Sequence, residues 1–395
     1  MKIIRSVVET IIPILAILMA CFYPTSLEGK IFEAQGTIIY YLISSLIIIT
    51  LFVKTKYDKK NIYIGTFFLI YLTVVTFISV IAVNTNFSIA RFAPVFLSLI
   101  LFMIKIKTVP NFNVLKGVLE VISIVILLWN IGILIGQEAL ISFTINSYSQ
   151  FNDFTVSYGL SIGKTIFTFG AHTFASFFYM LIFYMWYITI KRDKKNRKFR
   201  YVIYLLGFLI FTVLLKSSAA LLFSIMMILL LFDLIKGSVN KIFFIFASVI
   251  TSIFLLNSFL IDVYRGMVTS STNGVIPRYF SENNIFSANF SVLKENILGI
   301  GFTIPRDYAI TYTDSGYLVY FTMGNIVFVI VIYYMLYRFL KNNIETNFKV
   351  IFLIILLFEL AIPSLIYMKT TYFLIFLVYY LKSLNEKVKK NEYEY

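Results

Sequence analysis

Long apolar runs alternate with short polar segments along nearly the whole chain. A membrane-spanning helix needs about 20 predominantly apolar residues, and about twelve runs approach that length. The centres of these runs are Ile14, Ser44, Val74, Ser98, Val125, Ile182, Leu209, Met226, Ser252, Val329, Leu356 and Phe376. The pattern predicts an all-α polytopic membrane protein, organised as a single integral membrane domain over residues 1–395.

Two polar segments are much longer than the others and are predicted to be external loops. The first covers residues 137–170, and the second, between the ninth and tenth spans, covers residues 262–316. Apolar side chains recur at helical spacing in the second loop, at Phe286, Phe290, Leu293 and Ile297. This spacing favours a helix lying on the membrane surface, and Gly299 favours its end.

Composition agrees with a membrane protein. The chain is 60% hydrophobic and 13% charged, whereas soluble domains carry about 25% charged residues. With the N-terminus in the cytoplasm, most basic residues fall in cytoplasmic segments, including the run Lys191–Arg200. This is the bias of membrane proteins, and it places both termini inside. We therefore attribute most of the net charge of +15 to the basic residues that orient the chain in a cell membrane. The expected partners of these residues are membrane lipids rather than nucleic acid.

Several kinds of chemistry are excluded by residue usage. The single cysteine, Cys21, and the single histidine, His172, rule out an internal disulfide and a multi-histidine metal site. No predicted cytoplasmic segment contains a phosphate-binding Gly-Lys-Ser/Thr loop, and neither a Walker-type nor a Rossmann signature occurs in the chain. We expect neither a metal nor a cofactor, and energy for any reaction comes from the substrate or an ion gradient. The stretch Met1 to Cys21 is interpreted as an uncleaved first helix rather than a signal peptide.

One ordered set of motifs lies in and after the second loop. Arg278 precedes Gly299-Ile300-Gly301, and Asp314-Ser315-Gly316-Tyr317-Leu318 then opens the next apolar run. This order resembles the large external loop of Wzy-type polysaccharide polymerases, which are related to O-antigen ligases. The resemblance covers the last third of the chain, and the rest only in its hydropathy.

The resemblance implies a membrane glycosyltransferase. Its substrate would be oligosaccharide repeat units linked to polyprenyl (undecaprenyl) pyrophosphate, polymerised into a capsular or other surface polysaccharide at the outer face of the cytoplasmic membrane. A flippase and a chain-length regulator are implied as partners. Two alternatives stay open: a lipid-linked oligosaccharide flippase or other transporter, and an O-antigen-type ligase.

Basic residues on the predicted outer side are candidates for binding the pyrophosphate, because topology selects against them there. Arg278 stands at the family's arginine position, and arginine offers phosphate two parallel hydrogen bonds. Other outer candidates are Arg306, Lys216 and Arg91. In the family, the turn that here holds Lys216 often ends in an arginine that binds phosphate. Ser218 stands at that arginine position in this chain. Either Lys216 takes over the phosphate contact, or this phosphate ligand is missing. We interpret Lys30, Lys164, Lys294 and Lys369 as extending toward lipid head groups.

Two residues are predicted to deprotonate the acceptor hydroxyl group. His172 begins the sixth span at its outer end, and Asp314 abuts the family-like segment. The alternatives are a packed histidine, a helix-capping role for Asp314, and Asp307 as the base. Glu359, near the middle of the eleventh predicted span, is a further functional candidate because carboxylates at membrane depth are costly.

Overall fold

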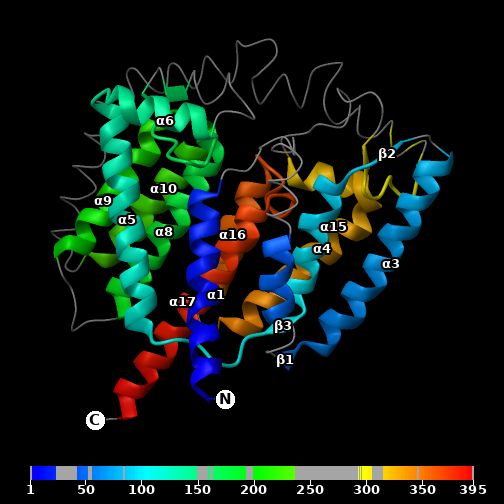
Figure 1. Ribbon diagram of the computed structural model, residues 1–395, viewed down its shortest axis with the longest axis horizontal. Helices are drawn as coiled ribbons and strands as arrows, with labels where there is room; N and C mark the ends of the chain where they lie inside the picture. Colours follow the sequence, from blue (N-terminus) through cyan, green and yellow to red (C-terminus); the bar gives the residue numbers. More distant parts are fainter. Residues whose placement is uncertain are drawn as a thin grey trace. The chain divides into compact units, whose positions relative to one another are not determined.

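The structure is a computed structural model. It describes residues 2–23, 42–51, 56–82, 85–148, 159–160, 163–192, 199–235, 292, 294, 296–304, 315–344 and 347–393. Most of these residues are helical (Figure 1). The helices are α1 (Lys2–Phe22), α3 (Lys59–Ala82), α4 (Ile89–Phe102), α5 (Phe112–Leu134), α6 (Glu138–Tyr148), α8 (His172–Arg192), α9 (Phe199–Leu214), α10 (Ser218–Leu234), α15 (Gly316–Asn343), α16 (Phe348–Glu359), the 3-10 helix η2 (Ser364–Ile366) and α17 (Met368–Tyr393). The strands are β1 (Lys56–Tyr57), β2 (Asn86–Phe87), β3 (Ile104–Lys105) and β4 (Thr303–Ile304).

Apolar helices dominate, as expected for an all-α membrane protein. In the described part of the chain, 4 helices are long and apolar enough to cross a membrane: α3, α5, α8 and α15. Shorter apolar helices include α9, α10 and the segment Leu42–Leu51. The ninth predicted run, centred on Ser252, lies outside the described residues, and the number of spans stays a prediction.

The chain forms two compact units. The first contains Met1–Val121, Asn146–Asp153 and Ala288–Tyr395, and the second contains Ile122–Ile145 and Phe154–Ser287. The division falls inside α5, so one helix contributes to both units.

The second unit is built around α8. This helix packs against α9 and α10, the green helices of Figure 1, and is buried along nearly its whole length. A helix that is apolar all round is buried on all sides. Its polar atoms are satisfied internally: Trp186 donates to the Ser123 hydroxyl at 2.8 Å, and Asn130 donates to the Tyr179 hydroxyl at 2.7 Å. α6 lies inside the predicted loop 137–170, which is therefore partly helical.

In the first unit α1 packs along α17, and α15 contacts α3, α4 and α16. Two short antiparallel strand pairs join segments far apart in sequence. Lys56 of β1 pairs with Lys105 of β3, and both belong to segments predicted to be cytoplasmic. Phe87 of β2 pairs with Thr303 of β4, and both belong to segments predicted to be external. The fold thus groups segments by their predicted side.

Helix α15, which lies in the apolar run centred on Val329, is broken into two halves. Gly324 (φ −154°, ψ 32°) and Asn325 (φ 55°, ψ −167°) leave helical geometry. The rings of Tyr317 and Tyr333 lie 5.2 Å apart, although a straight helix would separate them by about 24 Å along its axis. The first half, up to Gly324, therefore folds back against the second. Asn325 caps the second half, since its side-chain oxygen accepts from the backbone N–H of Val327 at 2.8 Å.

The motif Gly299-Ile300-Gly301 closes this break. The backbone N–H groups of Ile300 and Gly301 donate to the carbonyls of Thr322 (2.9 Å) and Met323 (2.8 Å), which end the first half of α15 and need partners. Gly299 has φ +93° and Gly301 φ +62°, a region that favours glycine. A Cβ at Gly299 would lie 2.5 Å from the Met323 carbonyl oxygen. The motif therefore has a packing role in this chain, which suffices to explain both of its glycines.

The predicted surface helix of the second loop is described only at its end. Val292 and Lys294 are helical and Ile297 lies in a turn before Gly299. Phe286, Phe290 and Leu293 lie outside the described residues.

Candidate functional site

Three basic side chains of the second unit form a cluster, Lys164, His172 and Lys216, in which Lys164 lies within electrostatic range of the other two. Lys164 and Lys216 are near enough for their charges to interact. The charge of Lys164 also interacts with the imidazole ring of His172. Lys216 is exposed, and the other two are half-buried. The cluster joins two residues predicted as site residues, His172 and Lys216, through a third, Lys164, which was predicted to extend toward lipid head groups.

Secondary structure adds positive potential to this basic cluster. α8 begins at His172, as the hydropathy pattern predicted, and α10 begins at Ser218, two residues after Lys216. The first N–H groups of a helix carry a partial positive charge. Two helix N-termini and two ammonium groups therefore converge, an arrangement that suits an anion such as phosphate.

The electrostatic state of Lys164 reflects this crowding. Burial lowers the pKa of its ammonium group, and the charge of Lys216 lowers it further. In the described part of the chain neither lysine forms a salt bridge with a carboxylate. Positive groups held together in this way repel one another, and a bound anion would offset that repulsion.

The backbone beside the basic cluster is held in unusual conformations. Lys216 has φ +49°, and Phe167, in the loop between Lys164 and His172, has φ +51°. Such angles cost about 1–3 kcal/mol in a residue with a side chain, and they gather at functional sites. Thr165 fixes the loop by donating to the Phe211 carbonyl of α9 at 2.9 Å, and its own carbonyl accepts from the Tyr179 hydroxyl at 2.5 Å.

Arg91, predicted to bind pyrophosphate, lies in the first unit at the start of α4. Its guanidinium donates to the Thr303 carbonyl oxygen of β4 at 2.9 Å. That bond ties α4 to the segment that follows Gly299-Ile300-Gly301. A positioning role for Arg91 in this loop is thus visible, and a phosphate-binding role stays a prediction.

The remaining predicted site residues lie outside the described residues: Arg278 and Arg306 for pyrophosphate binding, and Asp314 as a base. The neighbour of Asp314, Ser315, is described, and its hydroxyl donates to the Glu359 carbonyl oxygen at 3.4 Å.

Glu359 was predicted to lie near the middle of a membrane helix. In the structure it is the last residue of α16. Pro363 follows four positions later and has no N–H with which to continue the helix. At 12 residues, α16 is about 18 Å long, shorter than a hydrocarbon core of about 30 Å. Glu359 faces the protein interior, since it is 0% exposed.

The carboxyl group of Glu359 reaches the family-like segment. A Cβ added at Gly316 would overlap its Oε2 atom, and its Oε1 atom accepts from the Tyr320 hydroxyl at 3.4 Å. The glycine after Ser315 is therefore explained by the space that Glu359 occupies. Gly316 and Glu359 are 43 positions apart in the sequence, so the local sequence pattern did not indicate their contact.

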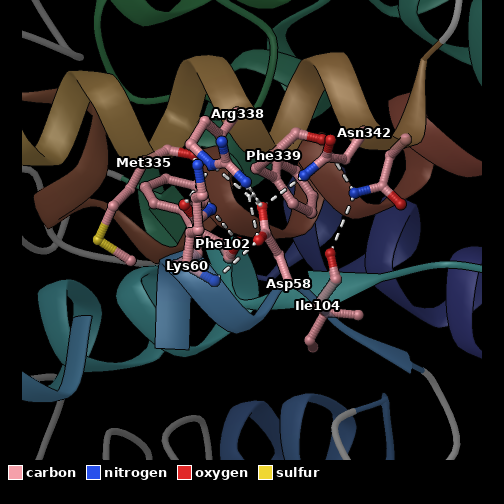
Figure 2. Close-up of polar contacts among 10 residues, drawn as sticks. Asp58, Lys60, Phe102, Ile104, Met335, Arg338, Phe339 and Asn342 are labelled. Carbon is pink, nitrogen blue, oxygen red and sulfur yellow. Dashed lines mark hydrogen bonds and ion pairs between the residues drawn. The ribbon is translucent and has the colours of Figure 1, made fainter. Parts of the chain in front are cut away.

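A second polar cluster, around Asp58, is structural (Figure 2). Asp58 accepts from the Arg338 guanidinium at 2.7 and 2.9 Å and from Asn342 at 2.5 Å. Asn61 accepts from Arg338 at 3.1 Å and donates to the Phe102 carbonyl at 2.7 Å. The hydrogen-bonding groups of this cluster are used internally, so it ties α3 to α15.

Lys369 also differs from its prediction. It is buried, with 5% of its surface exposed, and lies near the Cys21 thiol and the Tyr148 ring, not at a lipid head group. Among the described residues, no group of three or more His, Cys, Asp and Glu side chains lies together as a metal site would require. Comparison with protein families, characterised proteins and solved structures gives no match for this chain.

Proposed function

We propose that this protein polymerises oligosaccharide repeat units carried on polyprenyl pyrophosphate, at the outer face of the cell membrane. The observation that carries the proposal is the basic cluster of Lys164, His172 and Lys216 at two helix N-termini. A lipid pyrophosphate combines an apolar tail with a multiply charged anion. The apolar helices suit the tail, and the basic cluster suits the anion.

In this reaction the pyrophosphate is the leaving group. The acceptor hydroxyl oxygen forms a bond to the anomeric carbon of the donor sugar while the bond from that carbon to the pyrophosphate oxygen breaks. Polyprenyl pyrophosphate departs with the electron pair, and Lys164 and Lys216 stabilise its developing charge. The hydroxyl proton passes to His172 or Asp314. Arg278, Arg306 and Arg91 are the further candidates for phosphate contacts.

The test compares Lys164→Ala, Lys216→Ala and the double variant with Lys105→Ala, an exposed lysine on β3 at a segment predicted to be cytoplasmic. A hydrogen bond to a charged group contributes about 1.5–3 kcal/mol, so each single variant should lose roughly 10- to 150-fold in polymerisation rate. Polymer length is read on a gel beside a blot for the protein. Wild-type polymer from the double variant at normal protein level would refute the assignment.

A second candidate function, translocation of lipid-linked oligosaccharides, is favoured by the broken helix α15. Interrupted helices line the substrate and ion sites of many transporters. Deleting the gene and sizing the surface glycan separates the possibilities. Single repeat units on the surface indicate a polymerase, full-length chains still on the carrier indicate a ligase, and repeat units accumulating inside indicate a flippase.

A further inference from the structure

Glu359 lies where the end of α16, η2 and the first half of α15 meet. One of its two carboxyl oxygens, Oε1, accepts three hydrogen bonds. They come from the Ser364 backbone N–H at 3.1 Å, from the Ser364 hydroxyl and from the Tyr320 hydroxyl at 3.4 Å. The other oxygen, Oε2, is buried and has no hydrogen-bond partner among the described residues.

This asymmetry distinguishes the two forms of a carboxyl group. An ionised carboxylate accepts at both oxygens, whereas a neutral carboxyl has one accepting oxygen and one O–H group. Three donors on Oε1 mark it as the carbonyl oxygen. Oε2, which none of these donors reaches, is the position of the hydroxyl, and the Tyr333 hydroxyl also lies near the carboxyl group. The same donors occupy the lone pairs of Oε1 that a metal cation would need, so the geometry favours a proton over a sodium ion as the ligand.

No positively charged group among the described residues acts on the carboxyl group of Glu359. The groups that act on the carboxyl are Tyr320 and Tyr333 of α15 and Ser364 of η2, and Tyr317 of α15 also interacts with it. Glu359 forms no ion pair with any described residue. A buried ionised carboxylate without a cation is strongly unfavourable, so such groups take up a proton.

We propose that Glu359 is a proton-binding site whose neutral carboxyl group holds the end of α16 and η2 against the folded-back half of α15. Losing the proton leaves a buried charge with one oxygen unpaired, which becomes stable only when water reaches it. Proton binding is therefore coupled to the packing of the first half of α15 against the end of α16 and η2. This site is separate from glycan transfer and stands whether or not the chain is a polymerase.

The experiment uses the full-length protein in detergent and three variants: Glu359→Gln, Ser364→Ala and the control Glu386→Gln on α17. Glutamine reproduces the neutral carboxyl, with an oxygen that accepts and an NH₂ group at the Oε2 position. Infrared spectra taken across a pH titration should contain a protonated-carboxyl C=O band at neutral pH. That band should vanish in Glu359→Gln, shift in Ser364→Ala, which removes one donor to Oε1, and persist in Glu386→Gln.

Thermal unfolding across pH gives a second readout. An exposed glutamate in the unfolded chain is ionised above about pH 4.3, so folding with a neutral Glu359 takes up one proton. The unfolding equilibrium of the wild type should then shift toward the unfolded state by up to about tenfold per pH unit above that value. Glu359→Gln should lack this contribution and be at least as stable at pH 7. A Glu359→Gln protein that keeps the carboxyl band, or that melts well below wild type at pH 7, would refute the site.

Discussion

Asp58 forms an ion pair with Arg338, which lies 280 residues further along the chain. Asp58 comes immediately before α3, and Arg338 lies near the end of α15. Nη2 of Arg338 is 2.7 Å from Oδ2 and 2.9 Å from Oδ1 of Asp58. Nε of the same guanidinium reaches Oδ2 at 3.1 Å. This planar contact, together with Asn61 and Asn342, joins two of the four long apolar helices at one end.

Replacing Arg338 by lysine should weaken this join although the charge is retained. A lysine is a point charge and does not reproduce the planar set of donors. Hydrogen bonds to charged groups contribute about 1.5–3 kcal/mol to stability. Because the Arg338 side chain is 24% exposed, we expect Arg338→Lys to lower the free energy of unfolding by only about 1–2 kcal/mol. Unfolding in detergent measures it, and Lys341→Ala, one turn further along an exposed face, is the control. Equal stability of Arg338→Lys and wild type would show that the geometry contributes nothing.

Acid should destabilise the protein partly through Asp58. Partial burial raises the pKa of this carboxyl group, but the hydrogen bonds and charge of Arg338 outweigh burial, so the pKa lies below its usual range. A carboxyl with a lowered pKa in the folded chain stabilises it above the unfolded value of about 3.9, and this stability is lost as pH falls through the folded pKa. The melting temperature of the wild type should therefore fall below about pH 4 more steeply than that of Asp58→Asn. Parallel acid profiles of the two proteins would contradict this.

Gly301→Ala should disrupt the loop that closes the break in α15. The residue has φ +62°, and a Cβ there would lie 2.6 Å from the backbone nitrogen of Thr76. Strain and overlap together should lower the free energy of unfolding by about 2–4 kcal/mol. Gly117→Ala is the matched control, since a Cβ at Gly117 meets nothing within 4 Å and alanine is the better helix former. Protein level and melting temperature are the measurements, and a Gly301→Ala protein as stable as the control would contradict the packing role.

Two cysteine variants test which end of the first unit faces outward. Phe87 of β2 is 52% exposed, and Lys105 of β3 is also exposed. In a Cys21→Ser background, Phe87→Cys should react with a membrane-impermeant thiol reagent in intact cells, and Lys105→Cys only after permeabilisation. The reverse result would invert the predicted orientation.

The prediction for Arg278 rests on sequence, because this residue lies outside the described part of the chain. A bidentate arginine–phosphate contact depends on geometry, so Arg278→Lys should retain little polymerisation. Arg278→Ala should lose about a hundredfold, or about 3 kcal/mol of transition-state stabilisation. Arg265, another basic residue of the second predicted external loop, is interpreted as extending toward lipid head groups, so Arg265→Lys serves as the control and should be nearly silent. Normal polymer from Arg278→Ala at normal expression would weaken the polymerase proposal as a whole.

Features that depend on neighbouring residues were predictable. The apolar runs predicted a helical membrane protein, the start of α8 was placed at His172, and the turn holding Lys216 was placed between two spans. Hydropathy, helix ends and turns are determined by residues within a few positions of one another, so a linear pattern contains them.

Features that depend on long-range contacts were decided only by the tertiary structure. Lys164 was assigned to lipid head groups, yet it lies beside Lys216 in the basic cluster. Glu359 was placed in mid-span, yet it ends α16 and contacts Gly316. The run centred on Val329 reads as one helix, but Gly299-Ile300-Gly301 binds the carbonyls of its first half and lets it fold back. Hydropathy records how apolar each residue is, and it does not record which distant N–H group will satisfy a carbonyl once a helix is broken.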